Sequence, residues 1–475
     1  MTCSRAKTDV KSFARFDLAS IPPTEPLAEH REEPMTRCLL FFAVVLATSL
    51  ASAADWPQWM GPQRDDVWNE TGIIDEFPAG GPKVLWRKPV HGGFAGPAVA
   101  GGKVYVTDYE KATGDDKPAP TKRNDLQGKE RVICFDAKTG NELWKYQYDC
   151  SYSISYPAGP RCTPTVDDDL VFTLGAMGDL FCLDAEKGTV RWSKNLQTTY
   201  KAPLPLWGYA GHPLVYKNLL ICTAGGDGSA VVAFDKSTGN EVWKALSAQE
   251  IGYSPPTLIE AGGVTQLLVF NGNGINSLAP DSGELYWTVP LKTAFSMAIM
   301  APRKGGDYLF AGGHSSSSLG LKLDATKPAA TKVWQGSRTL GLAPVSGTPF
   351  VENGIAYGID GNGVFRAMRI DTGERLWATA KPVNGKDGER GANEGATFVT
   401  KNGDRFFIFG ENGDLVIARL TPEKYDEVSR TKLLDPVGVG LGRAVVWSHP
   451  AYADRCVFAR NDQEIVCVSL AKSSP

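Results

Sequence analysis

Short apolar runs separated by polar turns rich in glycine and proline follow one another along most of the chain. The four-residue runs at 103–106, 170–173, 219–222 and 355–358 have the length and the aliphatic and aromatic content of buried strands. A shorter strand is predicted before each run, and it often begins with a proline, which is tolerated at the first residue of a strand. These prolines stand in the pairs Gly96-Pro97, Thr163-Pro164, His212-Pro213, Pro255-Pro256, Thr348-Pro349 and His449-Pro450. The pattern predicts many short antiparallel strands and no long helix.

A segment that runs from an aspartate through a glycine to a tryptophan follows these strands six times. Its first copy, at 136–144, reads Asp-Ala-Lys-Thr-Gly-Asn-Glu-Leu-Trp. The aspartate can accept hydrogen bonds from turn N–H groups, the glycine allows a positive φ, and the tryptophan can pack on the next unit. Each copy is therefore predicted to be a β-hairpin, and four strands in a period of about 45 residues are typical of a β-propeller blade. The six copies end at Trp144, Trp192, Trp243, Trp287, Trp334 and Trp377, which are 48, 51, 44, 47 and 43 residues apart.

Two further blades are predicted after Trp377. The seventh has strands at 396–399, 405–409 and 415–420 and is expected to return near 432–434 without a tryptophan. The eighth is one strand short at the end of the chain, and residues 83–88, with a tryptophan in the expected place, supply the missing strand. The predicted fold class is therefore all-β: an eight-bladed β-propeller of four-stranded antiparallel blades, whose ring an N-terminal strand closes without an open edge. Seven blades are the alternative if the seventh unit is degenerate.

The N-terminal part of the chain has the pattern of a targeting signal. Arg37 precedes a 12-residue apolar run at 39–50, which is shorter than the roughly 20 residues of a spanning helix, and Ala-Ser-Ala-Ala follows it. We interpret residues 1–54 as a leader and signal peptide with Met35 as the true start, 55–82 as an N-terminal extension, and 83–475 as the propeller. Cleavage is expected near Ala53 or Ala54, which predicts a periplasmic or secreted protein without stable membrane insertion.

Composition and charge exclude several classes of partner. The 475 residues carry a net charge of −3, so nothing favours binding of nucleic acid. Seven cysteines remain after the predicted signal, and none forms a CxxC or CxxCH motif. Cys134, Cys182 and Cys467 occupy one repeated strand position, where a small buried side chain is the favoured interpretation. Cys150 and Cys162 flank a loop and are the expected disulfide in an oxidising compartment.

The Asp-x-x-Thr-Gly-x-x-x-Trp segments resemble the tryptophan-docking repeats of quinoprotein alcohol dehydrogenases and of their non-catalytic relatives, the PQQ-like repeat propellers. Residues 55–64, Asp-Trp-Pro-Gln-Trp-Met-Gly-Pro-Gln-Arg, resemble the start of exported bacterial members of that family. The resemblance covers residues 55–475 and implies the fold. It also raises the question of a PQQ cofactor held with calcium. The adjacent cysteine pair of the dehydrogenases is absent, and no acid or amide matches their base or calcium ligands, so no cofactor is expected and PQQ with calcium is the alternative.

Candidate site residues come from the channel face of the predicted ring. His212 and His449 each precede the proline of an innermost strand, and a metal or substrate site there competes with ordinary roles in the turn. Arg390, Asn393 and Glu394 lie in a polar segment that enters the seventh blade on the same face, either as a recognition site or as a solvated loop. We assign no catalytic residue and no metal ligand.

These observations lead to one functional hypothesis and two alternatives. The hypothesis is an exported, non-catalytic propeller that acts as a monomeric scaffold for a protein partner or a small extracellular ligand. The resemblance implies cell-envelope assembly as one role, because a propeller of the outer-membrane assembly machinery has the same repeat type. The alternatives are a PQQ- or metal-dependent oxidoreductase and a carbohydrate- or polyphenol-binding module, which the aromatic residues at 200–209 would suit.

Overall fold

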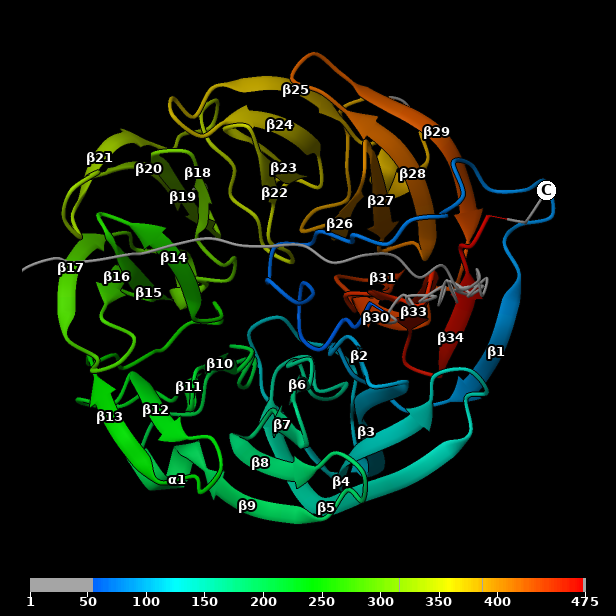
Figure 1. Ribbon diagram of the computed structural model, residues 1–475, viewed down its shortest axis with the longest axis horizontal. Coiled ribbons are helices and arrows are strands. Elements are labelled where there is room, and N and C mark those ends of the chain that lie inside the picture. The colour runs from blue at the N-terminus through cyan, green and yellow to red at the C-terminus, as the bar shows by residue number, and fades with distance from the viewer. Residues whose placement is uncertain (1–53, 316, 387, 473–475) are drawn as a thin grey trace, which may run out of the picture. The chain divides into compact units, whose positions relative to one another are not determined.

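Eight four-stranded antiparallel sheets stand around a common axis in the computed structural model (Figure 1), which describes residues 54–315, 317–386 and 388–472. In the first seven blades the strands follow chain order from the axis to the rim. The eight-bladed prediction is therefore confirmed, and the seven-bladed alternative is wrong. The predicted signal peptide lies outside the described residues. No helix in the described part is long and apolar enough to cross a membrane.

Blades one to four occupy the first half of the ring, and a short helix follows the second blade. Blade one is larger than the others, because its three outer strands are 12 or 13 residues long. The elements are β2 (Ala98–Ala100), β3 (Lys103–Gly114), β4 (Asn124–Asp136) and β5 (Glu142–Ile154); β6 (Thr165–Asp167), β7 (Leu170–Leu174), β8 (Asp179–Asp184), β9 (Val190–Asn195) and α1 (Leu196–Tyr200); β10 (Leu214–Tyr216), β11 (Leu219–Thr223), β12 (Val231–Asp235) and β13 (Glu241–Ala245); β14 (Thr257–Ala261), β15 (Val264–Asn271), β16 (Gly274–Leu278) and β17 (Leu285–Pro290).

Blades five to eight complete the ring, and the first strand of the chain joins the last blade. A separate two-stranded hairpin lies between blades seven and eight. The elements are η1 (Ala294–Ser296), β18 (Arg303–Gly305), β19 (Tyr308–Gly313), β20 (Ser317–Leu323) and β21 (Ala330–Gln335); β22 (Phe350–Glu352), β23 (Ile355–Ile359), β24 (Phe365–Arg369), β25 (Arg375–Thr379) and α2 (Lys381–Asn384); β26 (Thr397–Asn402), β27 (Arg405–Gly410), β28 (Asp414–Leu420) and β29 (Tyr425–Lys432); the hairpin β30 (Gly438–Gly440) and β31 (Arg443–Val445); and β32 (Ala451–Ala453), β33 (Cys456–Arg460), β34 (Glu464–Ser469) and β1 (Val84–Pro89).

The repeated segments form the outer hairpin of each blade and join it to the previous blade. In the first copy Asp136 Oδ1 accepts from Thr139 N at 2.8 Å, which closes the turn. Six tryptophans donate their indole N–H to a carbonyl in or next to the outer turn of the following blade. Trp287 differs, because its Nε1 donates at 2.9 Å to Gln266 within its own blade. The six bonds run from Trp86 to Ala137, Trp144 to Ala185, Trp192 to Lys236, Trp243 to Pro280, Trp334 to Ile370 and Trp377 to Thr421.

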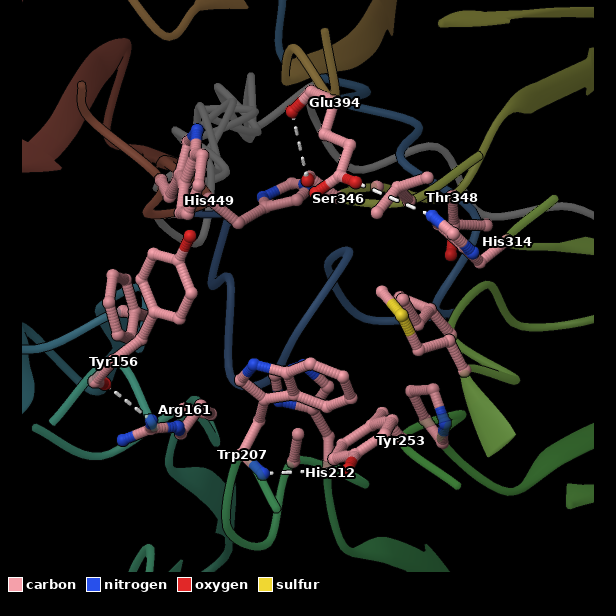
Figure 2. A pocket seen from close by; sticks show the side chains of 18 of the residues that line it. Tyr156, Arg161, Trp207, His212, Tyr253, His314, Ser346, Thr348, Glu394 and His449 are labelled. Carbon is pink, nitrogen blue, oxygen red and sulfur yellow. Dashed lines mark hydrogen bonds and ion pairs between the residues drawn. The ribbon is translucent and has the colours of Figure 1, made fainter. Parts of the chain in front are cut away.

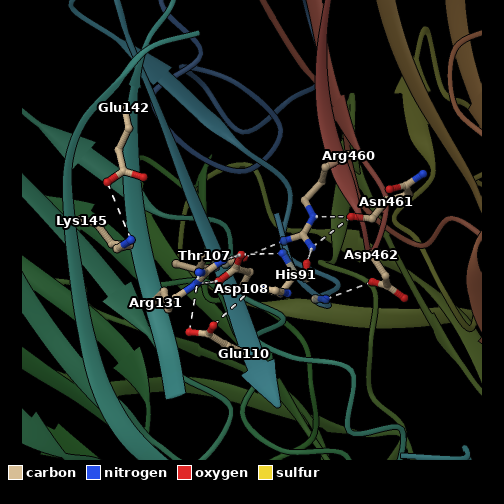
Figure 3. Close-up of polar contacts among 11 residues, drawn as sticks. His91, Thr107, Asp108, Glu110, Arg131, Glu142, Lys145, Arg460, Asn461 and Asp462 are labelled. Atoms are coloured by element: carbon tan, nitrogen blue, oxygen red, sulfur yellow. Dashed lines mark hydrogen bonds and ion pairs between the residues drawn. The ribbon is translucent and has the colours of Figure 1, made fainter. Parts of the chain in front are cut away.

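Strand β1 pairs with β34 and closes the ring, as predicted. A polar joint reinforces the contact of blades eight and one (Figure 3). The fully buried guanidinium of Arg460 donates to the carbonyls of His91 and Thr107, the latter at 2.6 Å. Next to it, the buried Asp108 accepts two hydrogen bonds from Arg131 at 2.6 and 2.8 Å and one from His91 N. The closing blade is thus held by side chains as well as by a strand.

Two details of the sequence interpretation are wrong. The last strand of blade seven is β29 (Tyr425–Lys432), so it ends at the first residue of the predicted range 432–434 and lies mostly before it. The expected Cys150–Cys162 disulfide is not formed: both thiols are free, and they lie in different core clusters. In contrast, the cysteines at the repeated strand position are buried, as expected for small core residues.

Candidate functional site

A cavity of about 320 Å³ lies on the axis of the ring and takes lining residues from all eight blades (Figure 2). We call it the axial pocket. Apolar surface dominates its lining, and a few polar groups interrupt that surface. Such a cavity is at the lower end of the range of about 300–1,000 Å³ found for small-molecule sites.

The N-terminal extension forms the floor of the axial pocket. It crosses the centre of the ring, where it is drawn in blue in Figure 1, and contributes the buried Trp59 to the lining. The indole of Trp59 stacks on His212, with ring centroids 4.8 Å apart and an angle of 9° between the planes. Arg64 fastens the segment, because its guanidinium donates to the carbonyls of His212 and Pro213 at 3.1 and 3.0 Å.

The residue before the first proline of a blade lines the axial pocket in six blades. Because a residue before proline is held in an extended conformation, it enters each innermost strand in the same way. The repeat that builds the blades therefore also builds a ring of positions around the axis. These positions hold Gly96, Thr163, His212, Pro255, Thr348 and His449.

Aromatic side chains from the loops form the walls. Trp447 packs between Phe94 and Tyr156, with ring centroids at 6.2 and 5.9 Å. Another pair, Trp207 and Tyr253, meets edge to face at 5.5 Å in a different part of the wall (Figure 2). These distances are typical of favourable aromatic contacts, so the walls are packed before any ligand enters.

The two histidines predicted from the sequence both line the axial pocket, but they differ in charge. His212 Nδ1 accepts from Thr163 N at 2.9 Å, and burial, together with the nearby Arg64, lowers the pKa of His212 well below its usual value. It is therefore neutral at pH 7. Burial also disfavours the charged form of His449, but Asp66, 3.1 Å from Nε2, outweighs burial and raises the pKa of His449. The extension thus supplies the counter-ion of a histidine in blade eight.

The polar segment before blade seven reaches the axial pocket at one residue only. Glu394 lines it, and its Oε1 lies 3.4 Å from His314 Nε2. Arg390 and Asn393 are exposed and are not among the lining residues. His91 lies away from the axial pocket, at the joint of blades eight and one, with its Nε2 3.7 Å from Glu110.

The long hairpin of blade one contributes to the rim of the axial pocket. Its tip brings the exposed Pro120 and Thr121 to the lining. Arg123 ties this tip to the loop after α1, because its guanidinium donates to Leu204 O at 2.8 Å and to Ser153 O at 2.7 Å. Phe295, 59% exposed, lies on the rim in another blade and has a positive φ of 54°.

Arg161 is the cation that the sequence interpretation missed. Its guanidinium lies over the ring of Phe94, with 5.1 Å from Cζ to the ring centroid, and it lines the axial pocket. It donates to three backbone carbonyls, those of Gly159, Ser155 and Tyr156. Burial lowers the pKa of Arg161, and the nearby acidic groups Tyr152 and Glu130 offset this effect only in part. No carboxylate of the described residues forms an ion pair with it within 4 Å.

The donor set does not fit a quinone held by calcium. Glu394 is the single carboxylate among the lining residues, and it already faces His314. Within the described ranges, no group of three or more His, Cys, Asp or Glu side chains is placed to hold a metal ion. Calcium needs about six to eight oxygen ligands, so the oxygen ligands that the dehydrogenase chemistry requires do not converge on this cavity.

One signal in the sequence could have located more of the pocket. The six residues before proline form a complete set, of which only the histidines were singled out. Trp59 lies in the quoted opening motif, but nothing in its neighbours indicated that it crosses the axis. The other aromatic lining residues stand on loops of different length without a common spacing, so pattern analysis could not group them.

The ring, the tryptophan contacts and the axial cavity define a PQQ-repeat β-propeller with a pocket on its axis. A family model described as outer membrane protein assembly factor BamB matches residues 77–149 and 128–339, which is more than half of the chain. The chain belongs to this BamB-like family of PQQ-repeat propellers, which is related to quinohemoprotein alcohol dehydrogenases.

The chain matches only part of the length of two curated relatives. The chain is 27% identical to the outer membrane protein assembly factor BamB of Moranella endobia (strain PCIT) over 231 residues, 45% of this chain and 56% of the relative. It is 29% identical to the quinohemoprotein alcohol dehydrogenase ADH IIB of Pseudomonas putida over 219 residues, 42% of this chain and 30% of the enzyme. The match thus spans about half of the first protein and less than a third of the second.

Solved structures agree with the fold. BamB from Moraxella catarrhalis aligns with a TM-score of 0.54 and 15% identity over 83% of this chain and 99% of BamB. Quinohemoprotein alcohol dehydrogenase from Comamonas testosteroni aligns with a TM-score of 0.54 and 12% identity over 89% of this chain and 81% of the enzyme. At such identities the likeness shows the fold alone.

Proposed function

We propose that this protein is an exported, non-catalytic binding propeller that holds one small ligand in its axial pocket. The observation that carries the proposal is that the N-terminal extension forms a floor across the axial pocket. Because the extension crosses the axis and Trp59 packs on His212, the central cavity of the ring is a dead end with aromatic walls and few polar groups. Those are the usual properties of a ligand site.

A role as a scaffold in the cell envelope is the wider context of this proposal. The BamB relative is named an outer membrane protein assembly factor, and this chain covers 56% of it. The signal pattern at 35–54 is consistent with export. If it is a signal peptide, N-terminal sequencing of the exported protein will find Ala54 or Asp55 as the first residue. A start at Thr36 would contradict export by this signal.

The ligand site can be tested by filling it. Ser346 is a partly buried lining residue, and the substitution Ser346→Trp would place an indole in the cavity. Ser237→Trp, in an exposed outer turn, is the matched control. We would measure thermal shifts of the full chain with defined probes: aromatic acids, aromatic amides, disaccharides, phenols, and PQQ with calcium.

We expect at least one probe to raise the melting temperature of the wild type and of Ser237→Trp, but not that of Ser346→Trp. A shift that persists in Ser346→Trp, or no shift with any probe, would contradict the proposal. Binding of PQQ with calcium, followed by oxidation of an alcohol, would replace it with the oxidoreductase alternative. A shift with disaccharides alone would identify a carbohydrate-binding module.

A further inference from the structure

The charge balance of the axial pocket is uneven. Its one lining carboxylate, Glu394, faces His314, and His449 has Asp66 as its partner. Arg161 has no acidic partner within 4 Å in the part of the chain that the structure describes, and the hydrogen bonds of its guanidinium go to neutral carbonyls. The buried Glu130 acts on it only from beyond that distance. The unbalanced charge on this cavity is therefore positive.

Most other part-buried arginines of the protein do have acidic partners. Arg131 pairs with Asp108, and Arg443 pairs with Glu411 at 2.9 Å. Arg64 and Arg460 donate to carbonyls as Arg161 does, but both are 6% exposed or less and are enclosed by protein. Arg161 differs from both groups, because it combines an unpaired charge with access to a cavity.

The guanidinium of Arg161 also has hydrogen-bond donors that no protein group uses in the part of the chain that the structure describes. Its hydrogen bonds use Nη1 once and Nη2 twice, whereas Nε donates to none of the described residues. A charge-assisted hydrogen bond from such a group to an anion is roughly twice as strong as a neutral one, and low-polarity surroundings strengthen it further. The free donors of the Arg161 guanidinium are therefore suited to bind one anionic oxygen of a ligand.

The surroundings of Arg161 determine what the rest of the ligand must be. Phe94 lies under the guanidinium, and Trp447 and Tyr156 continue the aromatic wall from it. The cavity is small, and Trp207 limits it further along the wall (Figure 2). A flat ring can stack in this space, whereas a long or highly hydrated polar molecule would lose its water without enough hydrogen-bond partners.

From this arrangement we infer that the axial pocket selects a compact aromatic carboxylate, with its carboxylate on Arg161 and its ring against the aromatic wall. The inference rests on the proposed function, because it names the ligand class of that same site. The nearby Glu394 works against a second negative charge, so a single carboxylate is favoured.

Three naphthalene derivatives of the same ring size test the charge requirement on the unmodified full chain. These are 2-naphthoate, its neutral amide 2-naphthamide, and the cation 2-naphthylmethylamine, titrated by calorimetry at low salt. We expect 2-naphthoate to bind at least about tenfold more tightly than the amide, and the amine to bind most weakly. The preference should shrink as ionic strength rises, because the ion pair is partly exposed to solvent.

Variants then assign the preference to one side chain. Arg161→Gln should lower the affinity for 2-naphthoate at least about tenfold and leave the affinity for 2-naphthamide unchanged, whereas Arg161→Lys should keep part of the preference. Arg390→Gln is the matched control, since Arg390 is exposed near the same face but does not line the cavity. An equal loss of affinity for 2-naphthoate in Arg390→Gln would mean that the overall positive charge of this face sets the preference. That result would overturn the assignment to Arg161.

The remaining outcomes separate the two proposals. Equal binding of naphthoate and naphthamide by the wild type would overturn the carboxylate preference while leaving the ligand site in place. Binding of the amine alone would do the same and would point to Glu394. Failure of all three compounds, together with no probe response in the test with Ser346→Trp, would overturn both the ligand class and the ligand site.

Discussion

Gly188 of blade two lies directly against the indole of Trp144 in blade one. A Cβ atom built on Gly188 would come within 2.4 Å of the Trp144 ring, and the φ of Gly188 is +67°. The same contact joins Gly140 to Trp86 and Gly239 to Trp192. The glycine of the repeat is therefore needed twice, once for the backbone conformation of the turn and once for the close approach of the next tryptophan.

The variant Gly188→Ala separates these two needs when it is compared with Gly228→Ala. Gly228 has nearly the same φ, +68°, but a Cβ atom added to it would meet no other atom within 4 Å. Both variants should lose about 1–2 kcal/mol from left-handed backbone strain, and Gly188→Ala should lose about 1–3 kcal/mol more from overpacking. Urea unfolding followed by tryptophan fluorescence measures both free energies. Equal losses would mean that the tryptophan contact does not constrain the turn.

The fold could be predicted because its information is local and repeated. An aspartate, a glycine and a tryptophan at fixed spacing specify a turn and a contact, and six copies leave little freedom for the rest of the ring. The last strand of blade seven was misplaced because β29 has no tryptophan to mark it. The disulfide was misjudged because flanking a loop in sequence does not place Cys150 and Cys162 in the same part of the core.

The pocket was predicted only in part because its residues come from many blades and from loops of unequal length. The histidines before proline could be found, since the position repeats. Arg161 could not be found in this way. It stands out because no carboxylate of the described residues pairs with it within 4 Å, and a sequence does not show the absence of a counter-ion. Trp59 could not be placed because the path of the extension across the axis depends on contacts such as that of Arg64 with blade three.

The closure of the ring is tested by Arg460→Met. This change removes the hydrogen bonds to the carbonyls of Thr107 and His91 without shortening the side chain much, and it leaves buried acceptors unpaired. We expect a loss of about 2–4 kcal/mol in the free energy of unfolding. Arg455→Met is the control, because Arg455 is an exposed arginine in the turn of the same blade. If the two variants are equally stable, the joint in Figure 3 does not contribute to closure.

The extended hairpin of blade one encloses a carboxyl group, Glu130, which is 3% exposed. It accepts hydrogen bonds from the hydroxyls of Tyr148 and Tyr152 and from Ala176 N. Burial raises the pKa of Glu130 despite these bonds, and the charge of Asp179 adds to the increase. The folded protein therefore binds this proton more tightly than the unfolded chain does.

The pH dependence follows from that sign. The stabilisation from Glu130 is fully present below the unfolded pKa of about 4.3 and is lost as pH rises through the folded pKa. The variant Glu130→Gln has no such proton, so its stability relative to the wild type should increase between pH 4 and pH 7. Chemical unfolding across this range measures the difference, and the exposed Glu142→Gln should show no trend. A difference that does not change with pH would contradict a raised pKa at Glu130.

The pKa of His449 is also raised, but for a different reason. In Glu130 the folded protein favours the neutral form of the side chain, whereas in His449 it favours the charged form. Nε2 lies 3.1 Å from Asp66 and Nδ1 lies 2.9 Å from the carbonyl of Pro450, so both ring nitrogens face acceptors. The folded pKa is raised above the unfolded value of about 6.5. The resulting stability is fully present below pH 6.5 and is lost as pH rises through the folded pKa.

Asp66→Asn is the variant that tests this link between the extension and blade eight. Without the carboxylate, only the contact with the Pro450 carbonyl opposes burial, so the pKa of His449 should fall and the variant should lose most stability near pH 6. The gap to the wild type should narrow as pH rises through the folded pKa of His449, above which the histidine is neutral in both proteins. Histidine NMR titration together with unfolding at pH 6 and pH 9 gives both quantities. The control is His91→Gln, a solvent-facing histidine whose removal should have little effect at either pH. A constant gap between Asp66→Asn and the wild type would mean that Asp66 acts on the backbone of the extension and does not hold the charge of His449.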